Sequence, residues 1–154
     1  MISYTVSNVK GFMNLLLRTS VFDDWAVREI RLNTLVRYTI SGELNKAFLS
    51  EEEQRSGDYA LWADLKETMF SLIKGRKQPT LMQFTLAYPK EKITDVSTET
   101  IESFLINIHY ENQVLKVITA TSARTFSLER DAEQFWDGFV AGFLEKQGLE
   151  VEKD

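Results

Sequence analysis

The densest positive charge in the chain is the segment Lys74-Gly75-Arg76-Lys77, in a predicted turn between a helix and a strand. Lysine and arginine donate charge-assisted hydrogen bonds, so this segment could bind a phosphate group or an acidic partner. Cations at the C-terminus of a helix also stabilise its dipole without any further role. Lys74, Arg76 and Lys77 are the residues that we predict to bind an anion or a partner.

Side chains that commonly carry catalysis or bind metals are sparse. The chain has no cysteine and a single histidine, His109, which therefore lacks the nitrogen and sulfur partners of a typical metal centre. We interpret His109 as an ordinary histidine on one face of a strand. Carboxylates cluster at Asp23-Asp24, Glu51–Glu53 and Glu129–Glu133, partly at predicted helix N-termini, where the dipole favours negative charge. Glycine-rich phosphate loops are absent. We predict no catalytic residue, no metal site and no cofactor.

Charge is distributed unevenly along the chain. Met1–Lys77 carries 11 basic and 10 acidic residues and Gln78–Asp154 carries 7 and 13, which together give the net charge of −5. An acidic chain repels a nucleic-acid backbone unless its positive charge is concentrated, so we do not expect nucleic acid as a partner. No apolar stretch approaches the roughly 20 residues that span a bilayer, and the N-terminus does not resemble a signal peptide. We expect a cytoplasmic protein that does not bind a membrane.

Apolar periodicity predicts the elements that must position these residues. Ile2, Tyr4 and Val6 alternate as in a short strand, and Ser7 is a candidate N-cap for a helix over Asn8–Arg18. The next predicted element alternates without interruption from Arg28 to Ile40.

This alternation favours one long strand over a hairpin that turns at Asn33-Thr34. A two-residue turn there would place Leu32 opposite Leu35 and would put the later apolar residues on the other face. The length of the predicted strand exceeds the usual three to ten residues, so the hairpin stays an alternative.

The middle of the chain contains a second helix and a strand. Ser50 and Glu53 match a capping box and predict one short helical turn. Asp58 is the candidate N-cap of a helix that carries Trp62 through Ile73, and Gly75 is the expected left-handed residue at its end. The strand that follows covers Met82–Tyr88.

The last third predicts a hairpin and a long helix. The hairpin turns at Glu111-Asn112 and sets Leu115 opposite Ile108 and Val117 opposite Ile106, which keeps the apolar residues on one face. Phe126 and Leu128 suggest a further short strand. A final helix begins with Asp131 as its cap and is closed by Gly148.

Within this helix Gly138 and Gly142 cost stability, so we expect that they permit close packing against the sheet or another helix. The aromatic residues of the chain are expected to form mainly core, although they could line a pocket. The most prominent are Phe22, Trp25, Trp62, Phe70, Trp136 and Phe139.

The element order β-α-β-α-β-β-β-α indicates an α+β fold, an antiparallel sheet with two or three helices packed on one face. We expect a single domain over residues 1–148 and a frayed acidic tail over residues 149–154. Without a catalytic motif, the leading hypothesis is a non-enzymatic interaction module for a protein partner. The alternative is a small-ligand-binding protein or an enzyme with a pocket between sheet and helices. Self-association into a homo-oligomer stays open.

Several segments together resemble a known family. They are Val9-Lys10-Gly11-Phe12-Met13, Phe22-Asp23-Asp24, Ile40-Ser41-Gly42-Glu43-Leu44-Asn45, the Trp62, Leu65 and Phe70 spacing, and Leu72–Pro79. The combination resembles a family of uncharacterised single-domain proteins from Firmicutes, the domain-of-unknown-function family 5721, over nearly the whole chain. The resemblance implies a bacterial cytoplasmic protein. It supplies no activity, cofactor or catalytic residue, so function has to be argued from geometry.

Overall fold

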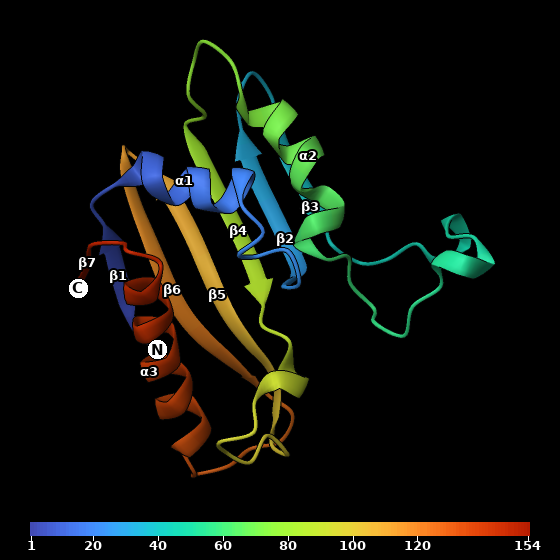
Figure 1. Cartoon of the computed structure of the whole chain (residues 1–154), viewed down its shortest axis with the longest axis vertical. Helices are drawn as coiled ribbons and strands as arrows, with labels where there is room; N and C mark the ends of the chain where they lie inside the picture. The colour runs from blue at the N-terminus through green and yellow to red at the C-terminus, as the bar shows by residue number, and fades with distance from the viewer.

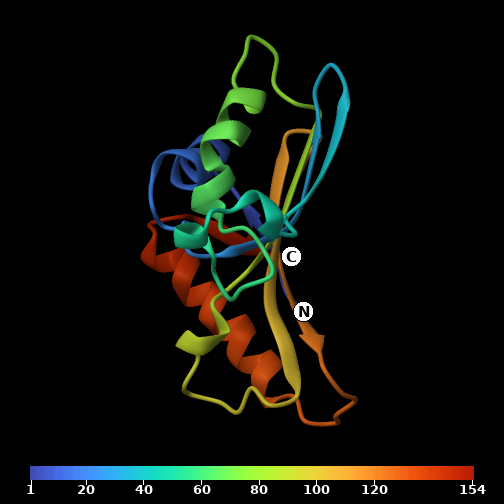
Figure 2. The ribbon, with the colours of Figure 1, turned by 90° about the vertical axis from the view of Figure 1, so that its right-hand side faces the viewer.

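A computed structural model describes residues 1–154 as a seven-stranded antiparallel sheet with three α-helices on one face (Figures 1 and 2). The predicted α+β class is confirmed. The strands lie in the order β3-β2-β4-β5-β6-β1-β7. The elements are β1 (Ser3–Val6), α1 (Val9–Arg18), β2 (Ala26–Asn33), β3 (Arg37–Ser41), α2 (Trp62–Ile73), β4 (Leu81–Ala87), β5 (Ile101–Glu111), β6 (Val114–Ala123), α3 (Asp131–Lys146) and β7 (Val151–Lys153), with short 3-10 turns at Lys46–Phe48, Glu51–Glu53 and Lys90–Lys92.

One continuous core fills the space between the sheet and the helices. Each helix buries one apolar stripe, as the 3.6-residue period requires. Phe12 and Leu16 come from α1, Met69 and Trp62 from α2, and Trp136 is the largest buried side chain of α3. α3 packs against β5 through Trp136, whose ring centre lies 5.5 Å from that of Phe104, whereas Phe135, Phe139 and Phe143 are only partly buried. None of the helices combines the length and the apolar character that crossing a membrane requires.

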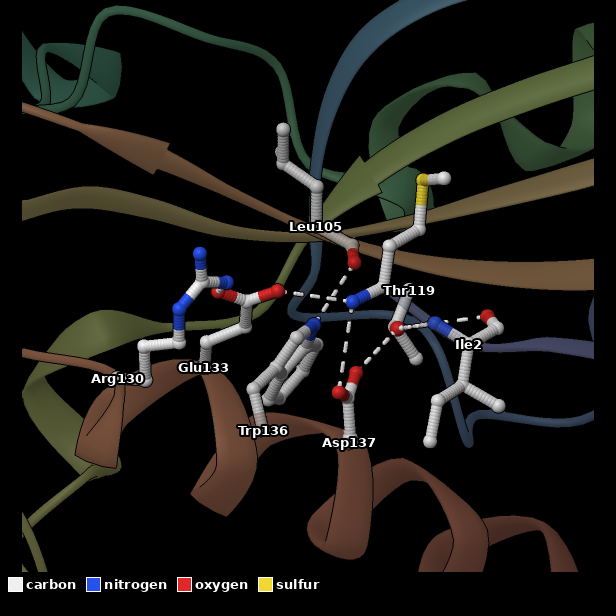
Figure 3. A network of polar contacts seen from close by, with 8 residues as sticks. Ile2, Leu105, Thr119, Arg130, Glu133, Trp136 and Asp137 are labelled. Atoms are coloured by element: carbon white, nitrogen blue, oxygen red, sulfur yellow. Dashed lines mark hydrogen bonds and ion pairs between the residues drawn. The ribbon is translucent and has the colours of Figure 1, made fainter.

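Polar contacts attach α3 to the sheet at its N-terminal half (Figure 3). The Thr119 hydroxyl donates to Asp137, and the indole N–H of Trp136 donates to the Leu105 carbonyl at 2.8 Å. The Met1 ammonium donates to Glu133 at 2.9 Å, and this hydrogen bond raises the pKa of the ammonium and lowers the pKa of Glu133. Strand residues and helix residues are therefore joined by directed bonds as well as by apolar packing.

The segment predicted as one long strand is a hairpin. β2 and β3 pair with Leu32 opposite Tyr38 and Ile30 opposite Ile40, and residues 34–36 form the loop. A three-residue loop pairs even positions with even positions, so every apolar side chain stays on its face. Alternation therefore continues unbroken through the turn, which is why the period of two could not distinguish the hairpin from a strand.

The hairpin of β5 and β6 is confirmed, but its predicted register is wrong by two residues. Leu115 lies opposite Tyr110 and Val117 opposite Ile108. The turn uses Asn112 and Gln113, whose φ angles are 54° and 66°. Two successive left-handed residues form the type I′ turn, whose twist matches that of the flanking strands.

Two helix caps differ from the prediction. The Asn8 side chain, not Ser7, caps α1 by accepting from the Gly11 amide at 2.9 Å. α2 is capped by Asp64, which accepts from the Leu61 amide at 2.9 Å, rather than by Asp58. Residues 59–61 are held extended by isolated bridges to β2 and to the segment after β3, so the helix cannot begin earlier.

At the ends of the other helical segments, two of the predicted caps are absent and two are present. Gly75 is not left-handed, because α2 ends in an extended Lys74 with φ −63° and ψ 142°. Asp131 is the first residue of α3, and its predecessor Arg130 is the N-cap without a side-chain cap. The capping box at Ser50 and the left-handed Gly148, with φ 74°, are confirmed.

Three predictions near the C-terminus are wrong. Phe126 and Leu128 form no strand, and their side chains are exposed. The predicted frayed tail instead forms β7, because Val151 to Lys153 pair with β1. Gly138 and Gly142 permit no close packing, since a Cβ at either position would have no neighbour within 4 Å.

Candidate functional site

A pocket of about 630 Å³ opens between α1 and the C-terminal end of α2. In Figure 1, α1 crosses the sheet beside α2, and the α2–β4 loop lies at the same end of the molecule. Most of the lining comes from residues within the segments 8–18 and 70–79, and Met82 and Tyr110 complete it. Segments at both ends of the first half of the chain therefore meet at one concave surface, which we call the basic pocket.

The charged residues that line the basic pocket are all cations. Two come from α1, Lys10 and Arg18, and two from the segment after α2, Lys74 and Lys77. No carboxylate lines this pocket, and none of the four cations has an ion-pair partner within 4.0 Å. A local charge of this kind in an acidic chain produces a positive potential to which anions are attracted.

The Phe70 ring lies close to one cation from α1 and one from the end of α2. The Arg18 guanidinium lies 5.4 Å from the centre of the Phe70 ring, and the Lys74 ammonium lies 5.9 Å from the same ring. Both distances are within the range of cation–π attraction. Phe70 thus restricts both cations while their N–H groups stay available.

The rest of the lining combines an apolar surface with a few polar groups. The phenol of Tyr110 donates to the Gln78 side chain at 3.0 Å, which orients that amide at the pocket. Small-molecule sites commonly combine apolar walls with a few placed polar groups. The apolar lining residues are Val9, Met13, Leu17, Phe70, Ile73, Pro79 and Met82.

Buried contacts fix α2 against α1. The Trp62 indole donates to the Leu16 carbonyl at 2.7 Å, and both residues are fully buried. Half-buried beside this contact, the Lys66 ammonium donates to Asp23 at 2.7 Å and to the Thr19 carbonyl at 3.0 Å. The two walls of the basic pocket are therefore held together by directed bonds.

Two of the four cations that line the basic pocket were predicted from the sequence. Lys74 and Lys77 line the basic pocket, whereas Arg76 is exposed and lies outside its lining. Lys10 and Arg18 were missed, because isolated cations on a helix carry no local signal. Their positions eight residues apart on α1 were visible, but only the packing of α1 beside α2 brings them to Lys74.

The other candidates from the sequence lie elsewhere. His109 alternates along β5 with the buried residues Ile108 and Tyr110, and its Nε2 atom lies 3.6 Å from the Glu111 carboxylate. No group of three histidine or carboxylate side chains is arranged to hold a metal ion. Among the aromatic residues, Phe22, Trp25, Trp62 and Trp136 are buried core, while Phe70 lines the basic pocket.

Comparison with known proteins gives one match. The sequence model of DUF5721, described as a family of unknown function, matches residues 15–152. No curated protein and no solved structure matches this chain. The match therefore supplies no ligand, substrate or partner, and the basic pocket has to be interpreted from its own chemistry.

Proposed function

We propose that this chain, which belongs to DUF5721, a family of unknown function, is a binding module that holds a small amphipathic anion in the basic pocket. The observation that carries the proposal is the set of four cations without ion-pair partners around a pocket that no carboxylate lines. The proposal keeps the cytoplasmic location expected from the sequence.

The charge of the ligand follows from electrostatics. Four like charges around one pocket repel one another, and a bound carboxylate or phosphate would replace that repulsion with attraction. Arg18 and the three lysines can donate several charge-assisted hydrogen bonds to such a group. A neutral or cationic ligand would gain none of this energy.

The apolar part of the ligand follows from the remaining lining. The pocket presents side chains such as Met13, Leu17 and Met82 beside the cations. An apolar group placed there contributes about 25 cal/mol for each Å² removed from water. Inorganic phosphate would use only the cations, whereas an alkyl phosphate would use both parts of the surface.

Calorimetric titration with octyl phosphate tests this function, with octanol and inorganic phosphate as partial ligands. We expect saturable binding of octyl phosphate at least about tenfold tighter than that of either partial ligand. Affinity should fall as salt rises, because exposed charges are screened within about 8 Å at physiological ionic strength. Equal binding of octanol and octyl phosphate would contradict an anion site.

A charge-matched pair of variants assigns the binding to this pocket. Substituting Gln for Lys10, Arg18, Lys74 and Lys77 should weaken octyl phosphate binding at least about tenfold. Four exposed cations outside the basic pocket provide a control with the same net charge change, and Gln at those positions should leave binding intact. The control positions are Arg37, Arg124, Lys146 and Lys153.

Arg76 separates the pocket from the sequence segment. Because Arg76 is exposed outside the lining, Arg76→Gln should change octyl phosphate affinity less than Lys74→Gln does. If both single variants weaken binding equally, the whole Lys74–Lys77 segment acts as a diffuse basic patch and the pocket is not the binding site.

A further inference from the structure

A second cleft, of about 880 Å³, lies at the opposite end of β2 from the β2–β3 turn. It is lined by the start of β2, the end of β4 with the residues that follow, the start of β5, and the segment between β3 and α2. We call it the Arg28 cleft. It shares no lining residue with the basic pocket.

Two β-bulges direct side chains into this cleft. The pairing of β2 with β4 shifts between Val27 and Glu29, so Arg28 is the extra residue there. The pairing of β5 with β6 shifts between Ile101 and Ser103, so Glu102 is the extra residue of the second bulge. Arg28 and Glu102 both line the cleft. Bulges commonly re-aim a side chain next to a functional site.

The Arg28 side chain is held in place without a counter-charge. Its guanidinium stacks 4.0 Å from the centre of the Tyr59 ring, and one terminal nitrogen donates to the buried Ser103 hydroxyl at 2.7 Å. The Nε atom is buried and has no hydrogen-bond partner. Partly buried guanidinium groups usually pair with a carboxylate, yet no carboxylate lies within 4.0 Å of Arg28.

The carboxylates of the cleft are not all neutralised by its cations. Asp58 pairs with Lys46 at 3.6 Å and Asp24 pairs with Lys92. Lys90 donates to a backbone carbonyl, that of Ile101, at 2.6 Å. Three further carboxylates of the lining have no ion-pair partner within 4.0 Å, and all three are exposed. They are Glu43, Glu91 and Glu102.

We propose that the Arg28 cleft binds a small zwitterion that carries one carboxylate and at least one ammonium group, such as a basic amino acid. The carboxylate would bind the arginine, whose planar fork matches that geometry. The ammonium groups would face the unpaired carboxylates, including Glu43 and Glu102. A simple anion would be repelled by those carboxylates, and a simple cation would leave Arg28 unpaired.

Calorimetric titration with L-lysine, cadaverine and hexanoate tests this ligand class. Cadaverine lacks the carboxylate of L-lysine, and hexanoate lacks its ammonium groups. We expect saturable binding of L-lysine, with cadaverine and hexanoate at least about tenfold weaker. No saturable binding of L-lysine, or equal binding of either partial ligand, would overturn the proposal.

Three variants place the binding in the cleft. Arg28→Lys keeps the charge but loses the fork, and should weaken L-lysine binding at least about tenfold. The double variant Glu43→Gln and Glu102→Gln, which changes only exposed side chains, should also weaken it. Glu51→Gln with Glu52→Gln is the matched control outside the cleft and should bind normally.

If both cleft variants bind L-lysine as the wild type does, the ligand does not bind in the Arg28 cleft. This conclusion holds even where one variant is poorly folded, because the other reports on the same cleft. Octyl phosphate binding is measured on the same proteins and should be unchanged by the cleft variants, because the two sites share no lining residue. Failure of L-lysine to bind would therefore leave the basic pocket untouched, and the two proposals can fail separately.

Discussion

The substitution Trp62→Phe should destabilise the protein by removing one buried hydrogen bond between α2 and α1. The indole N–H donates to the Leu16 carbonyl at 2.7 Å, and both side chains are fully buried. Leu16 lies in the last turn of α1, where the carbonyl has no intrahelical amide to accept from. No backbone amide outside the helix donates to it. Phenylalanine therefore leaves that carbonyl unsatisfied.

The magnitude has two contributions. An unsatisfied buried acceptor costs about 1–3 kcal/mol. The smaller ring leaves about 40 Å³ unfilled, which at about 24 cal/mol per Å³ costs about 1 kcal/mol more. The edge-to-face contact of Trp62 with Phe84, at 5.4 Å between ring centres, is one that phenylalanine can largely keep. We expect a loss of about 2–4 kcal/mol, a large part of the stability of an ordinary domain.

Urea unfolding followed by circular dichroism measures this loss, and thermal unfolding should show a Tm lower by about 4–16 °C. Trp136→Phe is the matched control, because the Trp136 indole also donates to a backbone carbonyl, that of Leu105 at 2.8 Å, away from the basic pocket. Both variants should lose stability, but only Trp62→Phe should weaken octyl phosphate binding. A loss below about 1 kcal/mol for Trp62→Phe would refute the hydrogen-bond reasoning.

Three further predictions follow from individual positions. Gly42→Ala should lower the free energy of unfolding in urea by about 1–3 kcal/mol or more, because the added Cβ would lie 1.7 Å from the Val27 carbonyl oxygen. Gly57→Ala is the control and should be nearly neutral, because its added Cβ would have no neighbour within 4 Å. The double variant Gly138→Ala and Gly142→Ala should raise the Tm, since alanine favours the helix by about 0.5–1 kcal/mol at each open position. An unchanged or lower Tm would mean that these glycines have a role in packing. The hydroxyls of Ser3 and Thr5 donate to Asp154 and lower the pKa of that carboxyl from 3.8 to about 2. The contribution of the Asp154 carboxylate to stability is therefore complete above pH 3.8 and is lost as pH falls toward 2. The protection of the β7 amides, taken relative to the intrinsic exchange rate at each pH, should therefore decrease over that pH range in the wild type, and it should change less in Asp154→Asn, which lacks the carboxylate.

Local sequence patterns determined most of the secondary structure. Alternation and helical periodicity located β1, α1, β4, the β5–β6 hairpin and α3, because burying one face of an element imposes its period on the residues of that element. The same patterns were unable to locate turns. A loop with an odd number of residues keeps the even-numbered side chains on the same face of the sheet, so the β2–β3 hairpin looked like one strand. A register shift of two residues also leaves every side chain on its face, so the pattern did not reveal that the predicted β5–β6 register was incorrect.

What only the tertiary structure decided is which distant residues share a site. The segment Lys74 to Lys77 was visible because its charges are neighbours in sequence, whereas Lys10 and Arg18 join it only when α1 packs beside α2. Arg28 appeared as an ordinary strand residue, because a bulge depends on how many residues the neighbouring strand supplies. Local propensity acts over a few residues, while charge pairing and cleft geometry depend on contacts between segments far apart in the chain. The sequence by itself therefore determined most of the elements, and their packing determined the two candidate sites.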